Sequence, residues 1–321
     1  MLQDIKRASF KHKNNKLAYY VKNYVRLCRP FVIFRRKPDK KLTEFSPADK
    51  EYIEQRVNYY NKLTQVTNLP DSAIQLGDFK LKEHQKTYFF DTYEYTRYFS
   101  QNLRICPLYG DITHVPDYPC ITKSRPISED NANSVLLKLD KIRHFLFLKD
   151  KNDFIGKKDM LVGRSKAHQE HRVRFLNMYR NHPMCDVGQV NRDKNHHLIA
   201  NRLTMEEHLK YKFILCLEGN DVASNLKWVM SSNSLAVMPK PKYETWFMEA
   251  QLIPDYHYVL IKDDFSDLEE RMRYYIDHPD EALQIISNAH KYIEQFKDKK
   301  REDLISLLVL NKYFEMTNQK P

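Results

Sequence analysis

An aspartate after a strand-like segment occupies a position suited to a general base. Asp111 follows a glycine after residues 103–108, an apolar run of strand length. A carboxylate at a strand end can project into a cleft and accept a proton from a hydroxyl within hydrogen-bond reach, although an aspartate that only closes a turn is the alternative. Lys123 and Arg125 place two cations beside this acid. Such a pair of cations on its own is usually solvated surface.

A second group of charges is suited to binding an anion. Residues 159–166 predict a strand and a turn at Gly163, and residues 169–180 predict the helix that follows. Arg164 and Arg172 lie around the start of this helix, where the helix dipole and the fixed cations attract the same negative charge. A guanidinium can bind two phosphate oxygens at once and keeps its charge throughout a reaction. The segment predicts a diphosphate site, with a basic surface loop as the alternative.

The stretch 211–258 predicts the α/β unit that would carry such a site. Residues 211–217 form an apolar run without polar alternation after Lys212, as expected for a strand covered on both faces of a parallel sheet. Turn-forming residues 218–221 follow, and apolar residues then recur at helical spacing. Ligands bind at the carboxyl ends of parallel strands, so a phosphate-bearing ligand is expected here. An α/β core unit without a ligand is the alternative.

Other segments predict the elements around these residues. Ser46 has the type and position of a helix N-cap, and the helix should end near Asn61. Residues 87–99 predict an aromatic-rich helix, whose rings could stack on sugars or pack in a core. Residues 131–147 predict a helix that runs into a strand, and residues 243–244 predict the start of another helix.

Composition limits the class of protein. The chain has 321 residues, 42% of them hydrophobic, which is ample for one or two packed domains. Five cysteines show no Cys-x-x-Cys pair, and no secretory signal precedes them, so we expect reduced thiols in the cytoplasm. No apolar run approaches the ~20 residues of a membrane-spanning helix.

Positive charge is concentrated at the N-terminus. Residues 1–41 contain thirteen Lys or Arg and two Asp, a net charge of +11 that equals the net charge of the whole chain. Within them, five residues share one apolar helical face: Leu17, Val21, Tyr24, Val25 and Cys28. Three interpretations remain open: peripheral contact with an anionic membrane, an ordinary helix packed on the domain with a solvated basic face, or nucleic-acid binding.

Short motifs in a characteristic order carry a likeness to a known family. They are Tyr211-Lys212-Phe213, Glu218-Gly219, Leu226-Lys227-Trp228, Ser232-Asn233-Ser234, Tyr243-Glu244, Pro254 with His257-Tyr258-Val259, and Ser266-Asp267-Leu268. With these motifs the chain resembles glycosyltransferase family 90, which contains protein O-glucosyltransferases and bacterial lipopolysaccharide core glycosyltransferases. The likeness is greatest to the bacterial branch and covers roughly residues 110–314.

The resemblance implies an α/β fold of the GT-B type, with two Rossmann-like domains facing a cleft. Residues 1–150 would form the acceptor-side domain with its basic arm, and residues 151–296 the domain that binds the nucleotide sugar. The charged connector after Asp150 suggests this boundary. Residues 297–321 would form a C-terminal helix that crosses back to the first domain.

The resemblance also implies an activity, namely inverting transfer of a hexose, glucose or galactose, from a UDP-sugar to a lipopolysaccharide core sugar. Asp111 would be the base, with Asp117 as the alternative. The donor-binding residues would be Lys123, Arg125, Gly163, Arg164, Arg172, Glu218, Gly219, Asn220, Asn225, Lys227, Tyr243 and Glu244. Asn225 stands where eukaryotic members carry an Arg, and Arg172 matches the family pattern better than Arg164.

These implications extend to cofactors and partners. The chain has no Asp-x-Asp triplet, so no metal and no cofactor besides the UDP-sugar co-substrate is expected. We expect a cytoplasmic protein with peripheral contact at the inner face of the cytoplasmic membrane and no nucleic-acid partner. The competing interpretation is a non-enzymatic basic adaptor that binds nucleic acid or anionic membrane through residues 1–41.

Overall fold

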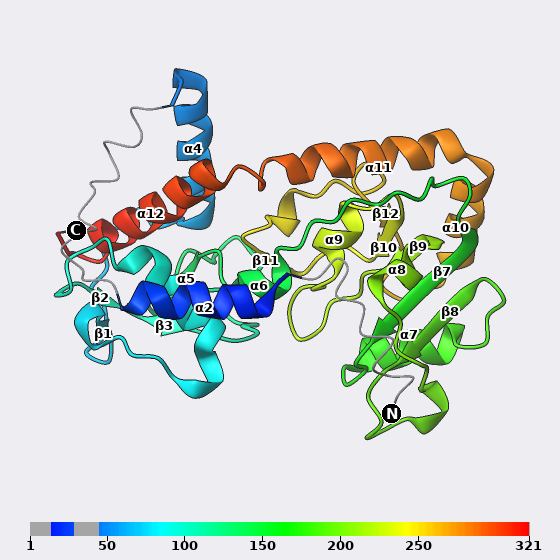
Figure 1. Cartoon of the computed structure of the whole chain (residues 1–321), viewed down its shortest axis with the longest axis horizontal. Helices are drawn as coiled ribbons and strands as arrows, with labels where there is room; N and C mark the ends of the chain where they lie inside the picture. Colours follow the sequence, from blue (N-terminus) through cyan, green and yellow to red (C-terminus); the bar gives the residue numbers. More distant parts are fainter. Residues whose placement is uncertain (1–13, 29–44, 321) are drawn as a thin grey trace. The chain divides into compact units, whose positions relative to one another are not determined.

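The computed structural model describes residues 14–28 and 45–320, which fall into two compact units (Figure 1). Among these residues, unit 1 contains Asn14 and the segments 144–241 and 251–295, and unit 2 contains 15–28, 45–143, 242–250 and 296–320. Each unit is therefore assembled from separate segments of the chain. The domain limits 1–150, 151–296 and 297–321 stay a sequence-based prediction.

Unit 1 is built on a five-stranded parallel sheet with the strand order β12-β10-β9-β7-β8. Its strands are β7 (Lys158–Ser165), β8 (Cys185–Gln189), β9 (Tyr211–Leu215), β10 (Leu235–Met238) and β12 (Val259–Leu260). Its helices are α7 (Glu170–Tyr179), η4 (His196–Leu198), α8 (Met205–His208), α9 (Leu226–Met230), α10 (Leu268–Asp277) and α11 (Pro279–Glu294). The chain runs from β7 outward to β8 and returns to β9 on the other side of β7, so the strand order reverses between β7 and β9.

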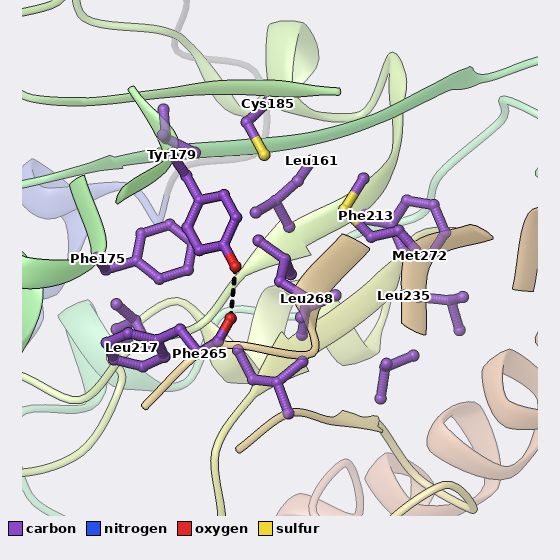
Figure 2. Close-up of a cluster of buried hydrophobic side chains, with 14 of the residues drawn as sticks. Leu161, Phe175, Tyr179, Cys185, Phe213, Leu217, Leu235, Phe265, Leu268 and Met272 are labelled. Carbon is purple, nitrogen blue, oxygen red and sulfur yellow. Dashed lines mark hydrogen bonds between the residues drawn. The ribbon is translucent and has the colours of Figure 1, made fainter. Parts of the chain in front are cut away.

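Both faces of this sheet are buried, as predicted for the 211–217 strand. On one face Phe213 and Leu235 pack in a cluster with Phe175 of α7 and Met272 of α10 (Figure 2). Tyr179 of α7 donates a hydrogen bond of 2.5 Å to the backbone carbonyl of Phe265 within the same cluster. On the other face Ile214, Val162 and Ala236 are also buried. The continuous apolar runs therefore correspond to strands covered on both sides.

Unit 2 contains three small sheets. They are the parallel sheet β3-β4-β6 and the antiparallel pairs β5–β11 and β1–β2. The strands are β1 (Ile74–Gln75), β2 (Arg104–Ile105), β3 (Pro107–Leu108), β4 (Cys120–Thr122), β5 (Ser124–Pro126), β6 (Ser134–Leu136) and β11 (Tyr243–Thr245). The helices are α2 (Lys16–Leu27), α4 (Pro47–Tyr60), η2 (Leu76–Asp78), η3 (Glu83–Gln85), α5 (Lys86–Thr96) and α12 (Lys299–Met316), while α6 (Lys141–His144) and η5 (Glu249–Gln251) span unit boundaries.

A buried polar cluster joins three segments of unit 2. Trp246 stacks on Tyr60 of α4 with ring centroids 3.8 Å apart, and its indole nitrogen donates a 2.7 Å hydrogen bond to Glu302 of α12. Glu302 also pairs with Arg56 (3.0 Å) and Lys138 (2.8 Å). Burial would raise the pKa of Glu302, but the two cations outweigh it and lower that pKa. The last helix is thereby fixed to α4 within this unit.

Two predicted helices are wrong. Tyr243 and Glu244 do not start a helix; they belong to β11, where Glu244 lies opposite Arg125 of β5. Residues 131–147 contain the buried strand β6, paired with β4, and only the four-residue α6. In both places pairing to distant strands overrides local spacing. The helix capped by Ser46 is confirmed, since the Ser46 hydroxyl accepts a hydrogen bond from the Asp49 backbone amide.

The helix α2 packs on α5 with a face that the sequence pattern did not favour. Tyr19 donates a 2.8 Å hydrogen bond to Asp91, and Arg26 pairs with Glu94 at 2.6 Å. Three residues of the predicted apolar face are exposed, with exposed fractions of 74% for Leu17, 54% for Val21 and 50% for Val25. Tyr24 is 44% exposed, but its ring packs edge-on against Phe90 of α5, with ring centroids 5.1 Å apart. The helix α2 therefore packs on the domain, as one of the three interpretations expected, but it does so through polar and aromatic residues and not through the predicted apolar face. The rest of the basic segment, 1–13 and 29–41, lies outside the described residues.

Candidate functional site

Asp111 lies in unit 2, just after strand β3. The preceding Gly110 has a φ of 125°, which residues with a Cβ rarely adopt, so the glycine permits the turn that presents Asp111. Strands β3 and β4 are parallel neighbours, so their carboxyl ends lie together and bring Lys123 beside Asp111. The Lys123 ammonium donates to Asp111 Oδ1 at 2.6 Å, and the lysine side chain is 2% exposed against 33% for the aspartate. The carboxylate is held in place yet stays accessible to a hydroxyl from solution.

Asp117 has a different environment. It lies in the exposed loop between β3 and β4, where its backbone carbonyl accepts a 3.0 Å hydrogen bond from the Asn133 side chain. A charge-assisted bond to a buried lysine fixes a carboxylate more firmly than a loop position does. This geometry favours Asp111 over Asp117 as the base, and the assignment stays a hypothesis.

Arg125 and Glu244 form a buried ion pair. Arg125 Nε donates to Glu244 Oε1 at 2.8 Å, and both residues are at most 1% exposed. The other guanidinium nitrogens donate to the backbone carbonyls of Tyr59 (2.7 Å), Tyr60 (3.3 Å) and Ser134 (3.2 Å), and Tyr59 donates its hydroxyl proton to Glu244. These contacts fix β5 and β11 to the end of α4. Tyr243, next to Glu244 in β11, is half-buried.

In unit 1, Gly163 and Arg164 lie in β7. A Cβ at Gly163 would come within 3.0 Å of the Leu215 side chain, so the glycine allows β7 and β9 to approach closely. Arg164 pairs with Asp186 at 2.5 Å and donates to the Asn201 carbonyl at 2.8 Å. Its guanidinium thus connects β7 to β8 and to the segment after η4.

Arg172 in the first turn of α7 lies at the point where the strand order reverses. Its guanidinium donates to the carbonyls of Leu217 (2.7 Å) and Glu218 (2.7 Å) after β9 and to the carbonyl of Lys166 (2.9 Å) after β7. A Cβ at Gly219 would come within 3.4 Å of Arg172 Nη2, so a larger residue there would press on the guanidinium. One cation therefore holds together the segments that follow two neighbouring strands.

Three further predicted residues surround the same turn. Asn220 accepts a 2.8 Å hydrogen bond from Gln169, the residue before α7. Asn225 donates its side-chain amide to the Leu215 carbonyl at 2.9 Å, and Lys227 in α9 is fully buried. In open parallel sheets the crevice beside such a reversal is the usual ligand site. At this reversal, unit 1 brings together five of the predicted donor-binding residues: Arg172, Glu218, Gly219, Asn220 and Asn225.

A pocket beside the Asp111 segment was not predicted. It has a volume of about 400 Å³ and is lined by Ile74, Asp78, Phe79, Lys80, Lys82, Gln85, Phe89, Pro107 and Tyr109. Tyr109, two residues before Asp111, stacks on Tyr88 of α5 with ring centroids 5.1 Å apart. In the sequence, only the position of Tyr109 at the end of a strand indicated this pocket. The loop that supplies Lys80 and Lys82 carries no recognisable motif.

Within residues 14–28 and 45–320, no three His, Cys, Asp or Glu side chains are grouped so as to hold a metal ion. In those same segments, every helix is too short or too polar to cross a bilayer. Independence from metal stays a prediction.

Comparison with known proteins identifies relatives of the chain. Residues 148–321 match the family model described as Glycosyl transferase family 90. The chain is 41% identical over 308 residues to O-glucosyltransferase LpsA of Dichelobacter nodosus, which covers 94% of this chain and 96% of the relative. It is 25% identical over 175 residues to Protein O-glucosyltransferase 3 of Homo sapiens, which covers 52% of this chain and 34% of the relative. These relatives favour a transferase over a basic adaptor, and the chain belongs to glycosyl transferase family 90.

Proposed function

We propose that this glycosyltransferase moves a hexose, glucose or galactose, from a UDP-sugar to a sugar of the lipopolysaccharide core, with inversion at the anomeric carbon. The 41% identity to an O-glucosyltransferase over nearly the whole chain supports the hexose. The single observation that carries the chemistry is the accessible Asp111 carboxylate held by buried Lys123 at a strand end.

Asp111 acts as the general base in this proposal. An acceptor hydroxyl attacks the anomeric carbon from the face opposite the diphosphate, and its proton passes to the Asp111 carboxylate. The new bond joins the acceptor oxygen to the anomeric carbon, while the bond from that carbon to the diphosphate oxygen breaks and UDP leaves. Lys123 keeps the carboxylate oriented, which matters because a base must lie within hydrogen-bond reach of the proton it removes.

The donor diphosphate binds near Arg172 in this proposal. The strand order reverses there, and the positive end of the α7 dipole adds to the guanidinium charge. The departing UDP gains negative charge, which a fixed cation stabilises without reorganisation. Because three of the guanidinium N–H groups bind backbone carbonyls, Arg172 holds the turn at Gly219 as well as supplying charge.

The acceptor binds in the pocket beside Tyr109 in this proposal. Phe79, Phe89 and Tyr109 offer aromatic rings on which the apolar face of a pyranose can stack. Lys80 and Lys82 are exposed at its rim and suit the phosphate or carboxylate groups of a lipopolysaccharide core. Tyr109, which lines the pocket, is two residues before the proposed base.

Contact with an anionic membrane fits the same substrate, because the acceptor is lipid-anchored. An apolar stripe on α2, formed by Leu17, Val21 and Val25, is exposed within a segment of net charge +11. A helix that combines an exposed apolar face with basic flanks can lie in the headgroup region of a bilayer. We therefore place the protein in the cytoplasm, at the inner face of the membrane.

The test is transfer by the purified protein. UDP-glucose, UDP-galactose and, as a control, a non-uridine nucleotide sugar are each incubated with lipopolysaccharide from a strain lacking this protein. Mass spectrometry should show one added hexose with a single UDP-hexose, and NMR of the product should show the inverted anomeric configuration. A folded protein that transfers no hexose from either UDP-sugar would overturn the proposal.

A further inference from the structure

Two cysteines in unit 2 lie side by side on neighbouring strands. Cys106 immediately precedes β3 and Cys120 begins β4, and the parallel register pairs Pro107 with Ile121. The Ile121 backbone amide donates to the Cys106 carbonyl at 2.8 Å, which keeps the two strands in register at this point. The two sulfur atoms are 3.0 Å apart, with the Cys120 thiol donating towards Cys106. Both are free thiols in the structure.

The two thiols differ in exposure and acidity. Cys106 is partly exposed, whereas Cys120 is buried. The hydrogen bond from Cys120 lowers the pKa of Cys106 to about 7, against the opposing effect of burial, and the pKa of Cys120 is raised. Cys106 therefore supplies a reactive thiolate at neutral pH, and Cys120 stands next to it as a second thiol.

We propose that Cys106 and Cys120 form a reversible disulfide on reaction with a hydroperoxide and that this disulfide slows glycosyl transfer. The Cys106 thiolate attacks one oxygen of the peroxide, the S–O bond forms as the O–O bond breaks, and a sulfenic acid results while the other oxygen takes up a proton and leaves as water or an alcohol. The Cys120 sulfur then attacks the sulfenic sulfur, the S–S bond forms and water leaves. Two electrons pass from the two sulfurs to one peroxide, so the step needs no other oxidant.

The backbone already meets the requirement for this bond. Neighbouring strands lie ~4.7–4.9 Å apart, within the ~4.4–6.8 Å range of Cα separations in disulfides. A short approach of the two sulfurs completes the bond, since they are 3.0 Å apart and a disulfide measures ~2.05 Å. Closing the remaining gap needs only a small movement of the two side chains and their strands, so oxidation leaves β3 and β4 folded.

Strands β3 and β4 connect the two cysteines to Asp111 and Lys123, the residues proposed to act in glycosyl transfer. β3 leads to Asp111 and β4 leads directly to Lys123, so the disulfide would join the strands that position this ion pair. On the other side, the Tyr313 hydroxyl accepts from the Cys106 amide (3.1 Å) and donates to the Pro119 carbonyl (2.9 Å), which anchors both strands to α12. In the proposal, the movement that closes the bond passes along β3 and β4 to Asp111 and Lys123, where a shift of ~1 Å can cost on the order of 100-fold in rate.

The first experiment tests the bond alone. The full chain is treated with hydrogen peroxide, remaining thiols are alkylated, and peptides are mapped by mass spectrometry without reduction. We expect a Cys106–Cys120 cross-linked peptide that dithiothreitol removes and that C106S and C120S both lack. Sulfinic acid at Cys106, or mixed disulfides through exposed Cys28, with no cross-link would overturn the proposal.

The second experiment tests the effect on transfer, and it alone rests on the proposed function. We expect at least a tenfold lower transfer rate after oxidation, recovery with dithiothreitol, and no loss in oxidised C106S, whose basal rate should match that of the wild type. Full cross-linking with an unchanged rate would overturn the regulatory effect. Failure of the proposed function would look different, because the reduced protein would then transfer no hexose while the cross-link still formed.

Discussion

At the scale of single residues, the partner of each charge decides what the charge can do. Arg125 and Glu244 neutralise each other in the interior of unit 2, whereas Asp111 keeps an exposed carboxylate beside its lysine. Arg172 lies between these cases, since it binds three carbonyls at the start of a helix and still contributes its charge there. The residue types at the strand ends indicated that Asp111 and Lys123 lie near each other. The buried Arg125–Glu244 pair could not be predicted in this way, because its two residues lie 119 positions apart in the chain.

Replacing Arg172 by Ala should weaken UDP binding by roughly 10- to 150-fold, because a charged hydrogen-bonded contact contributes ~1.5–3 kcal/mol. Arg172→Lys should recover only part of the affinity, since an ammonium keeps the charge but cannot reach the carbonyls on both sides of the turn. Isothermal calorimetry with UDP measures both variants.

The matched control is Arg174→Ala, which removes a guanidinium from the same helix that donates to the Asp263 carbonyl. This variant should bind UDP as the wild type does. Unchanged UDP affinity in a folded Arg172→Ala protein would remove Arg172 from the donor site.

At the scale of elements, apolar runs predicted the buried strands and capping residues predicted the helix starts. Residues 211–217 and Ser46 show this well, because their signals are local. The strand β11 could not be predicted in this way: its three residues pair antiparallel with β5, and nothing nearby signals that partner. The pocket beside Tyr109 was missed for a similar reason, since it combines a loop, a helix and a strand end.

The contact between α2, α5 and α6 should make stability depend on pH. Glu94 accepts charged hydrogen bonds from Arg26 (2.6 Å) and Lys141 (2.7 Å). Burial would raise the pKa of Glu94, but these cations outweigh it and lower the pKa to about 2. The folded pKa is below the ordinary value of 4.5, so this stabilisation is complete above about pH 4.5 and is lost as the pH falls towards 2.

Glu94→Gln should therefore lower the free energy of unfolding by on the order of 2–4 kcal/mol at pH 7 and by clearly less at pH 3. Urea unfolding at the two pH values measures the difference. Each variant must be compared with the wild type at the same pH, because a second buried group also titrates. The pKa of Asp91 is raised to about 6, so its protonation stabilises the fold as the pH falls. Exposed Glu83→Gln is the control, and an equal loss at both pH values in Glu94→Gln would contradict the assignment.

At the scale of the whole molecule, the proposed membrane contact combines the basic segment with the exposed stripe on α2. In that proposal, charge attracts the protein to anionic headgroups over the ~8 Å Debye length at physiological salt, and the stripe of Leu17, Val21 and Val25 then enters the headgroup region. Composition revealed the charge, and helical periodicity revealed the stripe. The periodicity could not show that the stripe points away from unit 2, because the polar residues on the other face of α2 find buried partners on α5.

The protein should sediment with anionic vesicles at low salt and be released at high salt. Replacing Leu17, Val21 and Val25 together by Ser should weaken vesicle binding at least tenfold, since burying each such side chain contributes up to ~1.5–3 kcal/mol. Neutralising Lys11, Lys13, Lys16 and Lys22 should remove the salt-dependent part.

Val66→Ser is the matched control, because Val66 is 61% exposed but lies away from α2 in sequence. Thermal unfolding checks that the triple variant is folded. Vesicle binding that survives the charge changes and high salt would exclude the charge-driven contact, and binding unaffected by the triple variant would exclude the stripe.

The central claim is that Asp111 removes the proton from the acceptor hydroxyl, and steady-state transfer kinetics of Asp111→Asn test it most directly. This variant keeps the shape of the side chain and an oxygen that can accept from Lys123, so UDP affinity should stay close to wild type. Loss of the charge beside the buried Lys123 ammonium should lower the thermal stability, and thermal unfolding checks that the variant is folded. The turnover number should fall by at least ~100-fold, as expected for loss of a general base. Asp117→Asn, measured in parallel, should retain most of its activity. Near-full transfer by Asp111→Asn together with its loss in Asp117→Asn would contradict the account and assign the base to Asp117.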